Sequence, residues 1–280
     1  MGTLYVVGTP IGNLEDLTIR AVRVLGQVSL VAAEDTRVTR RLLNHLGIRV
    51  PLTSYHRHNW ERRLPALLTA LESGDVALVT DAGMPGVSDP GSELVAQAAA
   101  LGFSVDVAPG PSSVTTAIAL SGMGEDGFFF MGFLPRRRND RRAQLEQVKI
   151  LGATLVIFEA PHRVKAAVTD ILATLGDRDI AVCREMTKLH QEVFRGTVSG
   201  ALDHFTEPRG EFVLVVAGAK APTGGSSLPV GDGRQEAKQQ LVDLRAEGTN
   251  SRDAIALVGR ETGLPRNVLY RLWLECGKPV

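Results

Sequence analysis

Leu4-Tyr5-Val6-Val7 leads directly into Gly8-Thr9-Pro10-Ile11-Gly12-Asn13-Leu14, and a second apolar run, 28–33, leads into Glu34-Asp35-Thr36-Arg37. Each apolar run has the length and composition of a buried strand, and each is followed by residues typical of a loop. In an open α/β sheet, the loops at the carboxyl ends of the strands line the ligand crevice. These two segments therefore predict a small-molecule site in the N-terminal half of the chain.

Short apolar runs alternate with amphipathic stretches in this half. Strands are expected at 4–7, 28–33, 76–80 and 105–108, and helices at 17–25, 37–46, 61–73 and 92–101. Strands separated by helices predict a mostly parallel sheet with right-handed crossovers. After Pro109-Gly110-Pro111, the hydroxyl of Ser112 or Ser113 is expected to cap a helix that runs to Ser121.

A second α/β unit is expected after this helix. Its strands are expected at 154–158, 180–183, 192–197 and 212–217, and its helices at 163–175 and 199–205. The uneven spacing of these strands predicts a mixed sheet.

The segment 221–233 lacks an apolar period and is typical of a linker. Helical patterning then returns at 234–247, 251–262 and 265–275, and the break at Thr262-Gly263-Leu264-Pro265 resembles a helix-turn-helix. We therefore expect an N-terminal α/β domain at 1–111, a second α/β domain at 112–220, the linker, and a helical extension at 234–280.

Composition excludes several classes of protein. The chain has 31 basic and 31 acidic residues, so nucleic-acid binding would have to come from a local patch. The two cysteines, Cys183 and Cys276, are too few for a disulfide framework or a zinc site, and Cys183 is interpreted as a buried strand residue. With no signal-peptide pattern and no run of about 18 apolar residues, a cytoplasmic protein is expected.

Three loops rich in glycine and proline follow expected strands of the first sheet. The loop at 8–13 is not a dinucleotide fingerprint, because Pro10 lacks an amide where a phosphate would need one. The loop at 81–91 begins with Asp81 at a strand end, and the third loop spans 108–113. This arrangement favours a ligand held by backbone groups and by shape, and ordinary tight turns are the alternative.

The cluster Glu34-Asp35-Thr36-Arg37 permits several interpretations. A metal site is disfavoured, because adjacent carboxylates on a strand point in opposite directions. Asp35 can simply cap the next helix. Alternatively, Glu34 or Asp35 orients a hydroxyl and Arg37 holds a phosphate. Nearby, His56-Arg57-His58 is interpreted as polar surface rather than a metal site.

Five arginines fall within the segment 136–142. Such a run is often a solvated face, but in a neutral protein it is also the local signature of polyanion binding. The aromatic residues just before it, Phe128-Phe129-Phe130 and Phe133, are expected in the core rather than on a stacking surface.

Seven motifs together resemble the ribosomal RNA small-subunit methyltransferase I family, within the tetrapyrrole-methylase-like class of S-adenosylmethionine-dependent methyltransferases. They are Val-Gly-Thr-Pro-Ile-Gly-Asn-Leu (7–14), Ala-Ala-Glu-Asp-Thr-Arg (32–37), Asp-Ala-Gly-Met-Pro-Gly-Val-Ser-Asp-Pro-Gly (81–91), Pro-Gly-Pro-Ser-Ser (109–113), Gly-Phe-Leu-Pro-Arg (132–136), Glu-Ala-Pro-His-Arg (159–163) and Arg-Glu-Met-Thr-Lys (184–188). The resemblance covers 4–217.

The resemblance implies two α/β domains with S-adenosylmethionine in the cleft between them, and a homodimer. The implied reaction is methylation of a cytidine ribose 2′-hydroxyl at the decoding centre of 16S rRNA in the 30S subunit. A tetrapyrrole or another small molecule is the alternative acceptor, and a DNA-binding regulator using the helical tail is the rival outside the enzyme class.

The residues expected to perform this chemistry fall into three groups. The candidates for a catalytic base are Glu34, Asp35 and Glu185. Cofactor contacts are expected from Pro10, Gly12, Asp81, Ala82, Gly83, Met84, Pro85, Ser112, Ser113 and Ala160. RNA contacts are expected from Arg37, Arg136, Arg137, Arg138, Arg141 and Arg142, and no metal is expected.

Overall fold

The computed structural model describes residues 1–125, 127–220, 232–262, 264 and 266–275. The chain forms two compact units, 1–219 and 220–280. The first unit contains two five-stranded sheets, and the second is helical.

The first sheet was predicted to be mostly parallel and is parallel throughout, with the strand order β3-β2-β4-β1-β5. Its strands are β1 (Thr3–Val7), β2 (Leu30–Ala33), β3 (Leu52–Ser54), β4 (Val76–Val79) and β5 (Ser104–Ala108). Its helices are α1 (Ile19–Leu25), α2 (Thr36–His45), α3 (Trp60–Ser73) and α4 (Ser92–Ala100), with a 3-10 turn, η1 (Leu14–Asp16), after β1. The sequence did not predict β3, because three residues are too few to show a period.

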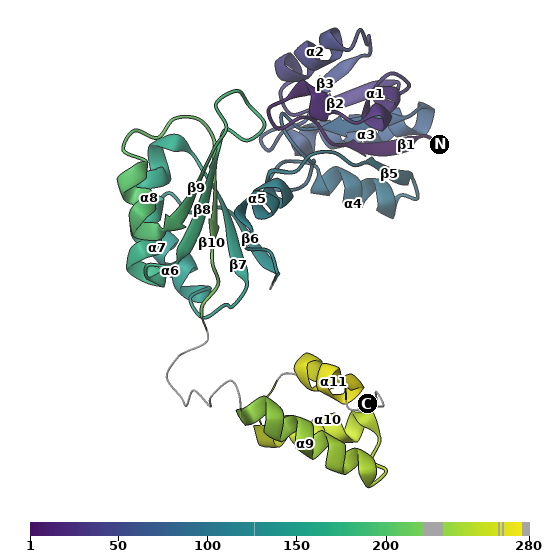
Figure 1. Cartoon of the computed structure of the whole chain (residues 1–280). Helices are drawn as coiled ribbons and strands as arrows, with labels where there is room; N and C mark the ends of the chain where they lie inside the picture. The colour runs from purple at the N-terminus through teal and green to yellow at the C-terminus, as the bar shows by residue number, and fades with distance from the viewer. Residues whose placement is uncertain (126, 221–231, 263, 265, 276–280) are drawn as a thin grey trace. The chain divides into compact units, whose positions relative to one another are not determined.

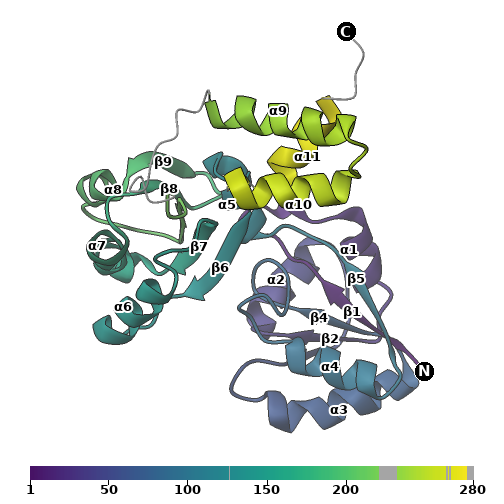
Figure 2. The same ribbon diagram turned by 90° about the horizontal axis from the view of Figure 1, so that it is seen from below.

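Helices cover both faces of this sheet. Ala77 and Val79 of β4 pack with α1 and α2, whereas Val76 and Leu78 pack with α3 and α4 (Figures 1 and 2). Alternate side chains of a strand point to opposite faces, so a strand covered on both sides reads as one continuous apolar run.

The second sheet is mixed, as predicted, with the order β6-β7-β10-β8-β9, in which only β6 and β7 pair in parallel. Its strands are β6 (Phe128–Phe133), β7 (Thr154–Glu159), β8 (Asp179–Arg184), β9 (Glu192–Thr197) and β10 (Phe212–Val216). Helices α6 (Arg138–Gln147), α7 (Val164–Leu175) and α8 (Val198–His204) cover one face, and α5 (Ser113–Ser121) covers the other (Figure 1). A 3-10 turn, η2 (Pro161–Arg163), precedes α7. Cys183 is buried in β8, as expected.

The aromatic residues of β6 do not form the expected core. Phe128, Phe129 and Phe133 are 44%, 47% and 56% exposed, because β6 is an edge strand of the sheet. Phe130 is half-buried and packs edge-to-face on Phe158, with 4.9 Å between ring centroids. The expected serine cap also fails in detail, because Ser112 occupies the N-cap position of α5 without a side-chain hydrogen bond.

The helical unit contains α9 (Asp232–Ala246), α10 (Ser251–Thr262) and α11 (Arg266–Glu275). Leu241, Val258 and Leu269 belong to its own apolar core, and the Arg245 guanidinium lies 4.9 Å from the ring centroid of Trp273. The expected linker at 221–233 lies almost wholly outside the described residues, as do Gly263 and Pro265 of the helix-turn-helix break. None of the described helices has the length and apolar character needed to cross a bilayer.

Candidate functional site

The three glycine- and proline-rich loops meet at the carboxyl edge of the first sheet. They follow β4, β1 and β5, which are neighbours in the sheet. The amide of Thr9 donates to the carbonyl of Gly83 at 2.9 Å, and the Gly83 amide donates back to Thr9 at 3.0 Å. The Thr9 hydroxyl also donates to the Thr80 carbonyl at 3.0 Å. The loops therefore form one connected surface.

Glycines in these loops let backbones touch. A Cβ on Gly8 would lie 2.7 Å from the Gly110 backbone and 2.7 Å from the Met84 sulfur. Gly83 has a φ of +81°, which favours glycine. Glycine at positions 8 and 110 thus serves the packing of loop on loop, whereas Asp81 and Ala82 remain exposed to a ligand.

The segment after β8 brings the second sheet to the same place. A Cβ on Gly12 would lie 2.7 Å from the Thr187 hydroxyl oxygen and 2.6 Å from Cγ of Lys188. Glu185 and Thr187 have positive φ angles of 49° and 66°. Such conformations cost about 1–3 kcal/mol each and cluster at functional sites.

Two buried hydroxyls at this site lack hydrogen-bond partners within the described residues, those of Thr80 and Thr187. Thr80 also lines a hollow of about 210 Å³ together with apolar side chains. The hollow is lined by Thr9, Pro10, Leu14, Val38, Thr39, Arg41, Leu42, Thr80 and Asp81. A buried hydroxyl without a partner is costly, so a polar ligand atom at this point would be stabilising.

Three carboxylates lie together at the ends of β2 and β4. The Asp35 amide donates to Asp81 at 3.0 Å, and the Asp81 amide lies 3.4 Å from a Glu34 oxygen. Partial burial of the two carboxylates raises the pKa of both Glu34 and Asp81, even though the Asp81 residue as a whole is exposed. Burial and the charges of Glu34 and Asp81 raise the pKa of Asp89 to about 6. The pKa of a catalytic base needs to be raised in this way.

Asp35 caps α2, which was the alternative interpretation of this residue. Its carboxylate accepts from the Arg37 amide at 2.8 Å and from the Arg37 guanidinium at 2.6 Å. These hydrogen bonds lower the pKa of Asp35 to about 2. Asp35 is therefore a weak base, and Arg37 is exposed but paired with it.

Glu185 is also held by partners. Its carboxylate accepts from the Glu211 amide at 2.8 Å and from Lys188 at 3.0 Å. Burial alone would raise the pKa of Glu185, but these hydrogen bonds outweigh burial and lower it. Of the three base candidates, Glu34 alone has the raised pKa suited to accepting a proton.

The remaining cofactor candidates are less exposed than Asp81 and Ala82. The Ala160 amide donates to the Glu159 carboxylate at 3.0 Å, so this amide is already engaged. Ser112 and Ser113 are half-buried at the start of α5, and Pro85 is buried. Among the described residues, no cluster of three His, Cys, Asp or Glu side chains has the arrangement of a metal site.

Three arginines of the run form hydrogen bonds to one buried carboxylate. Asp170, which is 1% exposed, accepts from Arg141 at 2.8 Å, from Arg142 at 2.7 Å and from Arg138 at 3.3 Å. Arg141 is itself only 6% exposed and also donates to the carbonyl of Arg136. The expected surface position of Arg141 is therefore wrong, because this side chain ties α6 to α7.

Three residues of the site were not singled out from the sequence, namely Thr80, Asp89 and Thr187. Thr80 ends a predicted strand beside Asp81, and this position was its only local signal. The raised pKa of Asp89 depends first on burial and then on carboxylates 55 and 8 positions before it in the chain, and local patterns reveal neither cause.

Comparisons with known proteins agree with this arrangement. Residues 3–201 match the profile of the tetrapyrrole (corrin/porphyrin) methylases. A protein of Synechocystis sp. called ribosomal RNA small subunit methyltransferase I is 44% identical over 98% of this chain and 98% of its own length. A protein of Thermotoga maritima with the same name is 49% identical over 78% of this chain and 99% of its own length.

Solved structures share the fold. Diphthine synthase superposes with a TM-score of 0.62 over 78% of this chain and 90% of its own, at 16% identity. Uroporphyrin-III-C-methyltransferase from Thermus thermophilus superposes with a TM-score of 0.57 over 78% of this chain and 94% of its own, at 21% identity.

Proposed function

Because the chain belongs to the tetrapyrrole (corrin/porphyrin) methylase family, with ribosomal RNA small subunit methyltransferase I proteins as its relatives, we propose that it methylates small-subunit rRNA with S-adenosylmethionine. The acceptor we propose is the ribose 2′-hydroxyl of a cytidine at the decoding centre, in the assembled 30S subunit. The observation that carries the proposal is similarity to these relatives over nearly the whole chain, at 42–44% identity.

The site suits S-adenosylmethionine, which has no phosphate and carries a sulfonium charge. Its loops offer no phosphate cradle, its carboxylates supply negative charge, and the hydroxyls of Thr80 and Thr187 need partners. The cofactor contacts we propose are Pro10, Gly12, Asp81, Ala82, Gly83, Met84, Pro85, Ser112, Ser113 and Ala160. Bound there, the cofactor supplies an electrophilic methyl group.

The residues of this chain position the acceptor and receive its proton. The loops would hold the acceptor oxygen within about 3–3.5 Å of the reacting carbon, the separation that positioned reactants need. With the methyl donor bound, Glu34 would accept the proton of the acceptor hydroxyl as that oxygen takes the methyl group. Glu34 is half-buried with a raised pKa, which gives it the properties of a general base.

Local basic surface supports rRNA as the acceptor. Arg136 and Arg137 are exposed just before α6, Arg138 is exposed but is paired with Asp170, and Arg37 is exposed beside the carboxylates. Phosphate contacts of this kind position a nucleic acid without reading its sequence. A ribosomal substrate would also place the protein in the cytoplasm.

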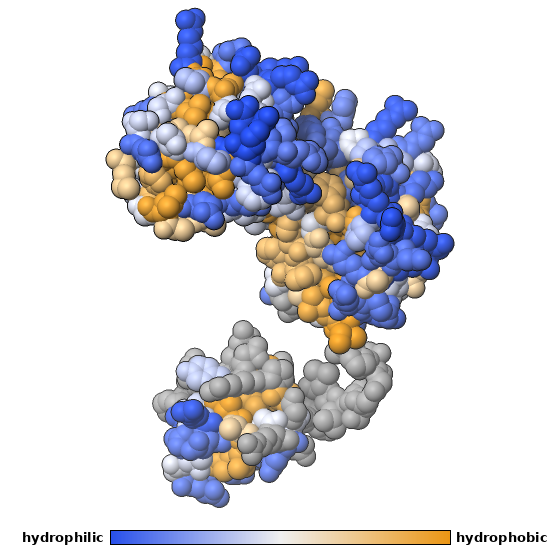
Figure 3. Space-filling model, turned by 180° about the vertical axis from the view of Figure 1, so that it is seen from behind, coloured by the Kyte–Doolittle hydropathy of each residue, from blue (hydrophilic) through white to orange (hydrophobic). Residues whose placement is uncertain are grey.

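The edge strands support a homodimer. Val105 and Val107 of β5 are 38% and 42% exposed, and three phenylalanines of β6 are exposed as well. Seen from behind, the first unit has apolar surface between hydrophilic regions (Figure 3). Exposed apolar edges of this kind are typical of protein–protein interfaces.

Methyl transfer to purified 30S subunits tests the proposed function. With labelled S-adenosylmethionine, label should enter 16S rRNA, and mass spectrometry should find it on a cytidine ribose. Label in a supplied tetrapyrrole, with none in 30S subunits, would favour the small-molecule alternative. Calorimetry should show binding of S-adenosylmethionine to the folded protein, and its absence would contradict the proposed cofactor.

A further inference from the structure

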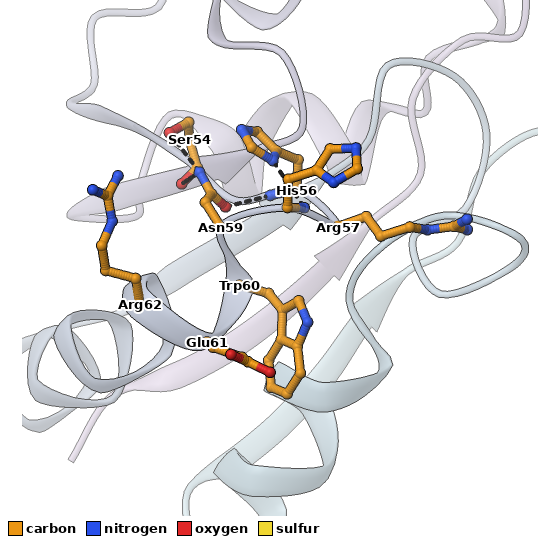
Figure 4. Close-up of a pocket in the computed structure, with 8 residues that line it drawn as sticks. Ser54, His56, Arg57, Asn59, Trp60, Glu61 and Arg62 are labelled. Atoms are coloured by element: carbon orange, nitrogen blue, oxygen red, sulfur yellow. Dashed lines mark hydrogen bonds between the residues drawn. The ribbon is translucent and has the colours of Figure 1, made fainter.

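A polar hollow of about 650 Å³ lies at the first turn of α3, outside the site described above (Figure 4). Its lining includes two arginines, two histidines and a tryptophan, but only one acidic residue. It is lined by Ser54, His56, Arg57, His58, Asn59, Trp60, Glu61 and Arg62. Arg57, His58 and Arg62 are exposed, so their polar groups face solvent. The hollow therefore suits an anion.

Hydrogen bonds of Asn59 hold the turn that shapes this hollow. The Asn59 side chain accepts from the His56 amide at 2.8 Å and donates to the Ser54 hydroxyl at 3.0 Å. The Asn59 side chain makes no cap hydrogen bond to α3. The positive end of the helix dipole therefore adds to the charge of the arginines.

The hollow borders the candidate base. Strands β2 and β3 pair in parallel with Ala33 opposite Ser54, so Glu34 and the residues after Ser54 leave the same edge of the sheet. The Arg57 guanidinium lies 3.5 Å from the Ser88 carbonyl, in the loop that carries Asp81 and Asp89. A strand bound in the hollow would thus pass close to the site of methyl transfer.

We propose that this hollow binds the sugar-phosphate backbone of the rRNA strand beside the methylated nucleotide. Arg57 and Arg62 point away from each other on either side of the helix turn, so each contacts a different phosphate (Figure 4). Arginine presents a planar set of donors that matches phosphate oxygens. The inference rests on the proposed function, because it takes rRNA as the acceptor.

The test measures methylation of 30S subunits by Arg57→Gln, Arg62→Gln and the double variant, across salt concentrations. Removing one arginine that neutralises a phosphate of a single strand should lower the salt slope by about 0.7, so the double variant should show a slope lower by about 1.4. Between about 50 and 200 mM salt, the affinity of the wild type should then fall about sevenfold more than that of the double variant. The effect should appear in KM for 30S subunits, with unchanged binding of S-adenosylmethionine by calorimetry.

Arg49→Gln is the matched control. Arg49 is an exposed arginine before β3, whereas the hollow follows the other end of this strand. Its replacement should leave KM and the salt slope unchanged. Arg62→Lys keeps the charge and should restore most of the slope, which separates phosphate binding from damage to the fold.

The outcomes separate the two proposals. If the wild type does not methylate 30S subunits, the proposed function fails. If the wild type does so and the folded double variant keeps its KM and salt slope, the hollow does not bind the rRNA. Weaker cofactor binding with an unchanged KM for 30S subunits would also overturn the inference.

Discussion

The two sheets of the first unit differ in how their acidic residues are compensated. At the first sheet, burial raises the pKa of Glu34, Asp81 and Asp89, and nearby amides and cations do not offset it. At the second sheet, burial would raise the pKa of Asp170 and Glu185, but hydrogen bonds from basic partners and an amide lower it. Each sheet has one exception. At the first sheet, hydrogen bonds from Arg37 lower the pKa of Asp35, and at the second, burial keeps the pKa of Glu159 raised despite Arg163. Well-compensated charges hold the fold, whereas poorly compensated ones remain available for chemistry.

The largest expected effect lies in α7, one of the helices that cover the second sheet. Asp170→Ala leaves buried Arg141 without its carboxylate, and removing one partner of a buried ion pair costs about 3–5 kcal/mol. Urea unfolding should show this decrease in stability, whereas Asp140→Ala, at an exposed acid of the neighbouring helix α6, should change little. Replacing the pair by Arg141→Met with Asp170→Leu should cost much less. A decrease below about 1 kcal/mol for Asp170→Ala would mean that the pair is not structural.

Glu34→Gln should have the next largest effect, on catalysis rather than stability. Removal of a general base lowers kcat by about 10²–10⁴-fold. Glu72→Gln, at an exposed acid of α3, is the control and should leave kcat unchanged. Because the pKa of Glu34 is raised, wild-type kcat should fall as pH decreases through that pKa, and the variant should lack this dependence. A larger effect from Glu185→Gln would instead place the base in the second sheet.

Asp89→Asn should stabilise the protein at neutral pH. The folded state favours protonated Asp89, with a pKa of about 6, so the wild type becomes less stable as pH rises from about 4 through 6. The variant cannot ionise, and at pH 7 it should gain about 1–3 kcal/mol relative to the wild type. Urea unfolding at pH 4 and pH 7 checks this, and an equal difference at both pH values would contradict it.

The smallest expected effect concerns the arginine run. Arg136→Ala and Arg137→Ala should each lower the salt slope of 30S binding by about 0.7 without a decrease in stability. Arg141→Ala should do the reverse, because its guanidinium is buried on Asp170. Circular dichroism melting and 30S binding across salt distinguish the two results. A change in slope from Arg141→Ala in a protein of wild-type stability would show that this arginine contacts RNA.

The sequence by itself determined the α/β class, the alternation of strands and helices in the first half, and the positions of the loops that contain Thr9 and Asp81. These features follow from local chemistry, since apolar period, glycine and proline act within a few residues. Only the tertiary structure decided which charged side chains are paired and which are buried without full compensation. The Asp170 side chain reaches arginines about 30 positions earlier in the chain, and Asp89, in the loop after β4, is affected by the charge of Glu34, which follows β2. Burial and pairing of charge depend on packing between distant segments, and no local pattern encodes that distance.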